Sequence, residues 1–186
     1  MLLKGVDQNA SSFSKHIKHI CKSSWKEELC KGNLIDGKVN PGSPFILIVS
    51  ASALRSLELL RGLKSLTRDC RPVKLFAKHM KLEEQITLLK SRVNIVTGTP
   101  SRIKKLIEID ALSLSRLSLV VIDLQRDAKG YSLFTLPQVS NEFWELYKSH
   151  FHGKLSQGSN DLNLRICFYG PMSVQEFEKS LKAEED

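Results

Sequence analysis

One stretch of the sequence, residues 73–123, constrains the fold more than any other, because β-rich and helical runs alternate along it. The apolar runs 73–77, 93–98 and 118–123 predict strands, and the amphipathic runs between them predict helices. This alternation is typical of a parallel sheet with crossover helices. We therefore predict an α/β fold whose ligands bind beyond the carboxyl ends of the strands.

The rest of the chain extends the same pattern. The continuous apolar run 45–49 predicts a strand buried on both faces, and a helix is expected to follow from Ser52. Residues 128–139 are expected to form a loop, 141–151 a helix and 164–170 a last strand, followed by a final helix.

Length and composition favour one domain. A chain of 186 residues with 41% hydrophobic residues suits a single core. We expect residues 1–43 to form an N-terminal helix and linker that pack on the domain formed by residues 44–186. The helix carries Phe13, Ile17 and Ile20 on one side, and Ser11, Ser12 or Ser14 is its expected cap.

The basic charge bears on partners. The formal net charge is +8 and the isoelectric point is near 9.4, for which nucleic-acid binding is the commonest reason, although a small basic domain can lack that role. The four cysteines form no CxxC pair, so neither a zinc site nor a redox motif is predicted. No apolar run has the length of a membrane span, and the N-terminus lacks the apolar core of a signal peptide, so we expect an intracellular protein without a membrane partner.

The polar residues expected at the carboxyl ends of the strands form the candidate binding site. The helix that starts near Ser52 presents free amides beside Arg55, which can hold a phosphate, although ordinary capping with a surface arginine explains the same residues. The TPSR segment starts another helix with Thr99 as its cap and proline at its first position. We predict that this edge binds a nucleic-acid backbone through the following residues: Ser50, Ser52, Arg55, Lys78, His79, Thr99, Pro100, Ser101, Arg102 and Lys105.

Two further motifs are of the kind found in nucleotide-binding and metal-binding sites. Residues 32–38 match the spacing GxxxxGK, but no strand precedes them and no helix has room to follow, so we interpret this as a chance match. Asp123 ends its strand without an acidic neighbour, which favours a cap or loop anchor over a metal ligand. We therefore predict no metal, no cofactor and no small-molecule substrate.

The polar side of the N-terminal helix is also basic. It holds Lys15, His16, Lys18, His19 and Lys22. This face can meet phosphate or simply be solvated.

Taken together, these segments resemble the first RecA-like domain of a DEAD-box RNA helicase over about residues 44–172. TPSR resembles the family's TPGR and is the closest match. The other correspondences are SASALR for PTRELA, Lys78-His79 for the paired glycines, LEEQITLLK for the helix after them, VVIDLQRD for VLDEAD, and CFYGPM for the SAT strand.

The departures from that pattern imply that ATP hydrolysis is lost. The phosphate loop is missing, Leu124 stands where the catalytic glutamate is expected, and Arg126 replaces the final aspartate. Nothing then positions and activates water for phosphoryl transfer. The resemblance implies a RecA-like parallel sheet flanked by helices on both faces, with no enzymatic activity.

SFSKHIKHICKSSWKEEL and VVIDLQRD resemble one degenerate branch, the Cms-one ribosomal small subunit homologues. This resemblance implies a small-subunit assembly factor of the nucleus and nucleolus, with pre-rRNA and pre-ribosomal proteins as partners. We expect the chain to bind RNA backbone there. The alternative is a protein-interaction scaffold without direct RNA binding, with the aromatic run 143–151 as its docking surface.

Overall fold

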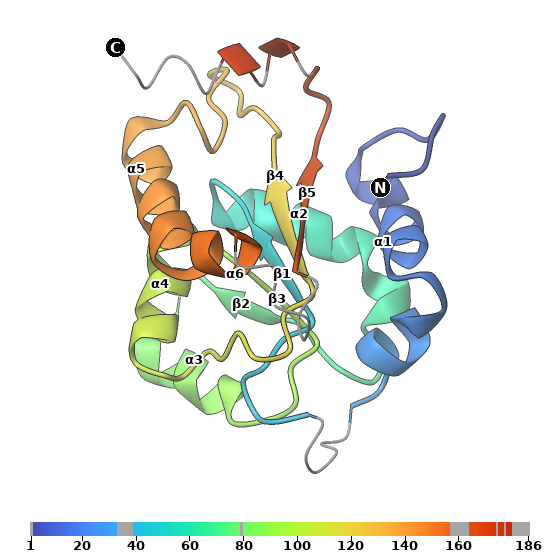
Figure 1. Cartoon of the computed structure of the whole chain (residues 1–186), viewed down its shortest axis with the longest axis vertical. Helices are drawn as coiled ribbons and strands as arrows, with labels where there is room; N and C mark the ends of the chain where they lie inside the picture. The colour runs from blue at the N-terminus through green and yellow to red at the C-terminus, as the bar shows by residue number, and fades with distance from the viewer. Residues whose placement is uncertain are drawn as a thin grey trace.

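The computed structural model describes residues 2–32, 39–78, 80–156, 164–173, 175–176 and 178–179 (Figure 1). Five parallel strands form one sheet in the order β2-β3-β1-β4-β5. Their bounds are β1 Ile46–Val49, β2 Val73–Leu75, β3 Ile95–Gly98, β4 Leu119–Asp123 and β5 Arg165–Tyr169. The parallel α/β sheet predicted from the sequence is confirmed.

Successive residues of the central strands point to opposite faces, and both faces are covered. In β1, Leu47 and Val49 belong to one hydrophobic core, whereas Ile46 and Ile48 belong to the other. All four side chains are fully buried, as the uninterrupted apolar run predicted.

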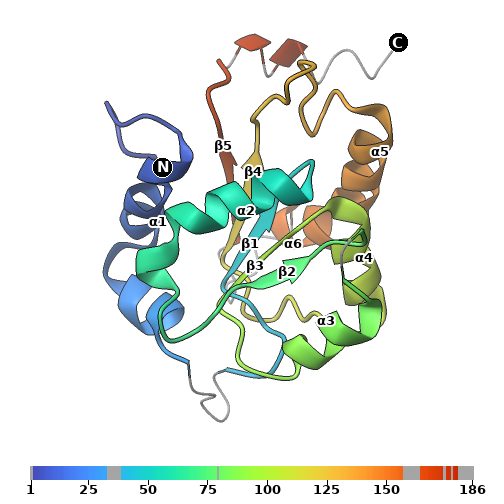
Figure 2. The same cartoon turned by 180° about the vertical axis from the view of Figure 1, so that it is seen from behind.

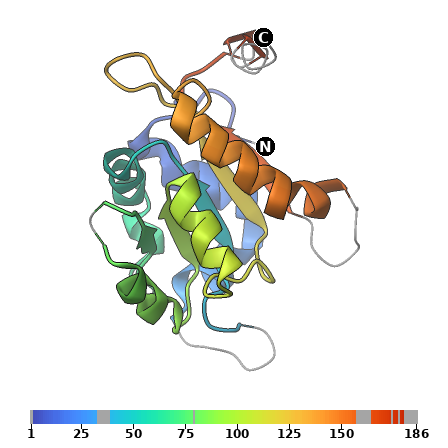
Figure 3. The same cartoon turned by 90° about the vertical axis from the view of Figure 1, so that its left-hand side faces the viewer.

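The first face is covered by four helices. They are α3 (Leu82–Leu89), α4 (Pro100–Glu108), α5 (Pro137–Leu146) and α6 (His152–Ser156). Figure 3 looks onto α4 and α5 with the sheet behind them. A π-helix, Tyr147–Phe151, joins α5 to α6.

The second face is covered by α2 (Ala53–Gly62) and by an N-terminal layer, which we define as residues 2–32. The layer contains α1 (Phe13–Cys21) and the π-helix Lys26–Cys30. It packs beside α2 (Figure 2), with Phe13 and Ile17 fully buried. The boundary between residues 43 and 44 stays a prediction.

A polar cluster ties the N-terminal layer to the amino end of the sheet. The buried Asn94 donates to the carbonyls of Leu29 (3.0 Å) and Lys31 (2.7 Å) and accepts from Arg92 and Arg116. Arg116 also forms an ion pair with Glu28, with 2.7 Å between Nη1 and Oε2. The layer is therefore held by directed bonds as well as by apolar packing.

These elements bear on three sequence expectations. Ser12 occupies the N-cap position of α1, as expected, but its side chain makes no capping bond; Asn9 caps the preceding 3-10 turn, where its side chain accepts from the Ser12 amide. His16 is fully buried, since its ring bonds the Leu3 amide and the Asp7 carbonyl, so it leaves the exposed basic face. The loop expected through residue 139 ends earlier, because Pro137 starts α5 at a position where proline suits a helix.

Two other expectations fall on undescribed parts of the chain. Most of the GxxxxGK spacing lies outside the described residues, and so does most of the expected final helix.

Gly98, the last residue of β3, allows β2 and β3 to approach where α4 begins. A Cβ atom at this position would lie 2.5 Å from the Leu75 carbonyl oxygen and 2.8 Å from the Leu75 Cβ. Backbone atoms of a neighbouring strand cannot move aside without disturbing the sheet.

We expect Gly98→Ala to lower the free energy of unfolding by about 1–3 kcal/mol because of this clash. Gly153→Ala is the matched control, since its Cβ meets nothing within 4 Å and alanine favours the helix. Chemical denaturation of both variants measures the difference. Equal stabilities would show that β2 and β3 do not need the glycine.

Candidate nucleic-acid interface

The carboxyl ends of β2, β3, β1 and β4 lie side by side along one edge of the sheet. Leu75, Gly98, Val49 and Ile122 are register partners in successive strands. Backbone hydrogen bonds continue the alignment past the strands, from the Ser50 amide to the Gly98 carbonyl (3.1 Å) and from Thr99 to Leu75 (3.3 Å). This edge therefore collects the helix starts and loops in which the sequence placed its candidate residues.

The turn between β1 and α2 separates two serines. Ser52 is exposed and caps α2, with its hydroxyl accepting from the Arg55 amide at 3.3 Å. Ser50 is fully buried; its hydroxyl donates to the Ser52 carbonyl and is hydrogen-bonded to the Ser56 hydroxyl. Ser50 thus shapes the turn, and only Ser52 presents a hydroxyl to a ligand.

Arg55 is turned toward the strand end instead of toward solvent. Its Nε lies 3.1 Å from both carboxylate oxygens of Asp123, and its Nη2 lies 3.0 Å from Oδ1. Its Nη1 also meets Glu58 at 2.8 Å. Arg55, which the sequence predicted to bind phosphate, is thus already bound by two carboxylates, and a phosphate would have to compete with them.

The pairing also explains the lone Asp123, which anchors the start of α2 to the end of β4. The carboxyl is 1% exposed, and its burial raises its pKa to about 6, against the opposing effect of the Arg55 hydrogen bonds. Desolvation of the carboxylate therefore outweighs the ion pair in setting the proton affinity.

We expect stability to fall as the pH rises from about 4 to 6 because of this one group. The folded carboxyl keeps its proton to about pH 6, whereas an unfolded aspartate loses it near pH 4, so the folded state binds more protons in between. Relative to Asp123→Asn, the wild-type chain should lose up to about 3 kcal/mol of unfolding free energy across this window. Denaturation of both proteins at pH 4 and pH 7 measures this. A difference that stays constant would contradict the raised pKa.

At the start of α4 the backbone follows the prediction, but the predicted side-chain contacts are not formed. Thr99 occupies the cap position with extended backbone, and Pro100 is the first helical residue, yet the Thr99 side chain makes no capping bond. The amides of Ser101 and Arg102 follow within the first turn, where amides have no partner inside the helix. The helix start can thus accept an anion through its backbone.

Arg102 points back into the domain. Its Nη1 donates to Gln85 Oε1 at 2.9 Å and to the Met80 carbonyl at 3.4 Å. Gln85 is itself buried and donates to the carbonyls of Lys74 and Phe76. This chain of bonds fixes the loop between β2 and α3 against α4, so Arg102 positions the edge.

The remaining candidate residues are two exposed lysines and His79. Lys78 lies in the loop that Arg102 holds, and Lys105 lies one turn into α4. His79 lies outside the described residues.

A hollow of about 590 Å³ lies between α2 and the segment after β4. This segment adds five lining residues that sequence reasoning did not include among the candidates: Gln125, Arg126, Asp127, Tyr131 and Leu136. All of them follow the end of β4, and this position was the signal in the sequence that could have identified them as lining residues. Cations and carboxylates are mixed in the lining, so the hollow is not a strongly basic site.

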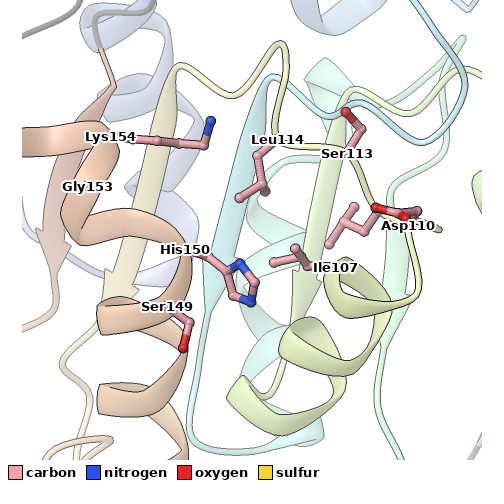
Figure 4. A pocket seen from close by; sticks show the side chains of 9 residues that line it. Ile107, Asp110, Ser113, Leu114, Ser149, His150, Gly153 and Lys154 are labelled. Carbon is pink, nitrogen blue, oxygen red and sulfur yellow. The ribbon is translucent and has the colours of Figure 1, made fainter. Parts of the chain in front are cut away.

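A second hollow, of about 620 Å³, lies at the other end of α4 (Figure 4). His150 and Lys154 face Ile107 and Leu114 across it, and none of the candidate residues lines it. The His150 Nε2 atom is buried without a hydrogen-bond partner, and burial lowers the pKa of the ring.

Within the described ranges, no cluster of three or more His, Cys, Asp or Glu side chains could hold a metal ion. Nor do these ranges contain a helix long and apolar enough to cross a membrane.

Comparison with known proteins decides the family. The model of the CMS1 family, whose description is "U3-containing 90S pre-ribosomal complex subunit", matches residues 8–169. The chain belongs to the CMS1 family. This confirms the resemblance to the Cms-one homologues.

Two CMS1-family relatives show the extent of the likeness. Protein CMSS1 of Xenopus laevis is 39% identical over 131 residues, which is 68% of this chain and 47% of that protein. Human Protein CMSS1 is 37% identical over 137 residues, or 73% and 47%. The chain thus spans about half the length of these relatives.

The fold is shared with DEAD-box proteins. The crystal structure of the yeast DEAD-box splicing factor Prp28 superposes with a TM-score of 0.53 at 15% identity, covering 76% of this chain and 31% of Prp28. The predicted RecA-like fold is thereby confirmed, and at this identity the likeness concerns the fold alone.

Proposed function

We propose that this chain is a non-catalytic ribosome-biogenesis factor of the nucleolus that binds RNA backbone within the small-subunit precursor. The description of its family as a subunit of the U3-containing 90S pre-ribosomal complex supports the process, the pre-ribosomal partners and the compartment. The RNA contact is supported by the carboxyl-end edge described above.

The observation that carries the RNA proposal is the alignment of two helix starts with two exposed lysines. The first turns of α2 and α4 offer backbone amides and the Ser52 hydroxyl, and Lys78 and Lys105 add positive charge. Amides and ammonium groups are suited to phosphate oxygens and carry no base information. Arg55 and Arg102 hold these groups in place from within.

The lack of catalysis is supported by the strand end where phosphoryl-transfer enzymes place their acids. Asp123 is occupied by Arg55, and Leu124 beside it is buried. Neither residue can activate water. A carboxylate bound to a guanidinium is also poorly placed to bind magnesium.

We expect Lys78→Ala combined with Lys105→Ala to weaken the binding of a single-stranded RNA roughly tenfold or more near physiological salt, because two phosphate contacts are removed. The dependence of log affinity on log salt should also become shallower by about one to two. Fluorescence anisotropy across a salt series measures both.

Lys90→Ala combined with Lys154→Ala is the matched control, since both lysines are exposed, lie away from the carboxyl edge, and change the net charge equally. If the two double variants lose affinity to the same extent, total charge and not this edge determines binding.

We also expect no magnesium-dependent ATP turnover by the purified chain, with or without RNA, since Asp123 is bound by Arg55 and Leu124 beside it is apolar and buried. A phosphate-release assay against a buffer blank tests this. Turnover that survives further purification and disappears in Asp123→Ala would establish an enzyme instead.

The scaffold interpretation is the second candidate, and the α5–α6 surface favours it. Trp144 and Tyr147 are only partly buried, and the Trp144 indole nitrogen is buried without a hydrogen-bond partner, as is His150 Nε2 in the neighbouring hollow. The partly exposed rings of Trp144 and Tyr147 offer apolar area to a protein partner, whereas the two buried nitrogen atoms are not reached from the surface. Under this interpretation, Tyr147→Ala would weaken pre-ribosome association in a sedimentation assay, whereas Lys78→Ala with Lys105→Ala would leave it intact.

A further inference from the structure

The exposed side of α1 is a stripe of positive charge. Lys15 and Lys18 lie on this side with His19 between them and the end of the helix, opposite the buried Phe13, and Lys22 follows directly after the last residue of α1. The ion pairs formed within and from the N-terminal layer, Lys31 with Glu27 and Glu28 with Arg116, lie outside the stripe.

A second basic segment lies against the same layer. The 3-10 turn after α2, Lys64–Leu66, and the residues that follow it add the exposed cations Lys64, Arg68 and Arg71. Packing between the two segments is close, because a Cβ atom at Gly32 of the layer would collide with the Asp69 carbonyl. Residues 2–32 and 64–71, which we call the basic flank, together carry five of the chain's eight net positive charges.

The flank is held rigidly. Arg165 of β5 donates to the Ile20 carbonyl at 3.0 Å, and the Tyr169 hydroxyl donates to the Asn9 carbonyl at 2.8 Å. With the bonds from Asn94 to the other end of the layer, α1 is fixed at both ends. The backbone that carries the cations is therefore fixed, and the Cα atoms of Lys15 and Lys22 lie about 10 Å apart along the helix axis.

The aromatic side chain on this flank indicates which form of nucleic acid suits it. Single-stranded ligands are usually held by bases stacked on aromatic rings. Here the Trp25 ring is covered by Lys18 Nζ at 4.5 Å from its centre and by Lys26 Nζ at 5.7 Å. The ring therefore positions the ammonium groups of Lys18 and Lys26, and it does not serve as a stacking platform for a base.

We propose that this flank is a second RNA-binding surface, separate from the carboxyl-end edge, that takes the phosphate backbone of double-helical RNA. Duplex RNA presents phosphates at fixed spacing and is recognised by shape and backbone contacts, which suits cations carried by a helix that is fixed at both ends. The proposal does not depend on the function of the carboxyl-end edge, because no residue is shared between the two surfaces.

The experiment compares the binding of an RNA duplex of about 20 base pairs with that of one of its strands, using the whole chain and the double variant Lys15→Glu with Lys22→Glu. Both lysines are exposed, so the fold should be preserved, and circular dichroism confirms this. We expect duplex affinity to fall roughly tenfold or more and its salt dependence to become shallower by about two, while single-strand affinity changes much less. Lys15→Gln with Lys22→Gln should give a smaller loss in the same direction.

Two controls make the result decisive. Lys90→Glu with Lys154→Glu makes the same change in net charge elsewhere and should retain duplex binding. Lys78→Ala with Lys105→Ala should retain duplex binding more fully than single-strand binding, so failure of either surface is seen separately.

The proposal is overturned if the stripe variant and the charge control bind the duplex equally well. It is also overturned if a poly-glutamate chain of matched charge competes with the duplex as well as unlabelled duplex does, since the flank would then suit an acidic protein instead.

Discussion

The burial of β1, β3 and β4 on both faces is the constraint on which this structure depends. A sheet of this kind is stable only if helices cover both sides. The helices that alternate with the strands supply most of the cover, but α2 alone leaves part of the second face open. The N-terminal layer closes that part, and Phe13, Ile17 and Leu29 complete its core. The basic flank is therefore the outer surface of an element that the fold requires.

Both arginines of the candidate edge are used inside the protein, while its lysines remain at the surface. Arg55 makes three contacts with one carboxylate, and Arg102 bridges a buried glutamine and a backbone carbonyl. A planar guanidinium fork suits such fixed arrangements, whereas an ammonium group on a flexible stem suits a mobile or variable phosphate. The edge thus separates residues that build it from residues that can meet a ligand.

The sequence predicted the strands and the helices that connect them in a parallel sheet, because hydrophobic periodicity is a local signal. It also predicted that polar residues gather at the carboxyl ends of those strands. It could not predict that Arg55 pairs with Asp123, since the two lie 68 residues apart and each has an ordinary local explanation. The inward turn of Arg102 depends in the same way on Gln85, 17 residues away. His16 was misplaced for the opposite reason: its helical position fits a polar face, but the preceding segment folds back over it and bonds both ring nitrogens.

The attachment of the N-terminal layer has a consequence for synthesis. Residues at the start of the chain bond to residues near its other end: Ile20 to Arg165, and Asn9 to Tyr169, across 145 and 160 positions. On the ribosome, α1 emerges long before β5 is synthesised. Phe13 and Ile17 therefore lack the strand that helps to cover them in the folded protein. Contacts this distant in sequence form late, and exposed apolar surface favours aggregation in the interval. The completed fold is therefore available only after residue 169 has left the exit tunnel.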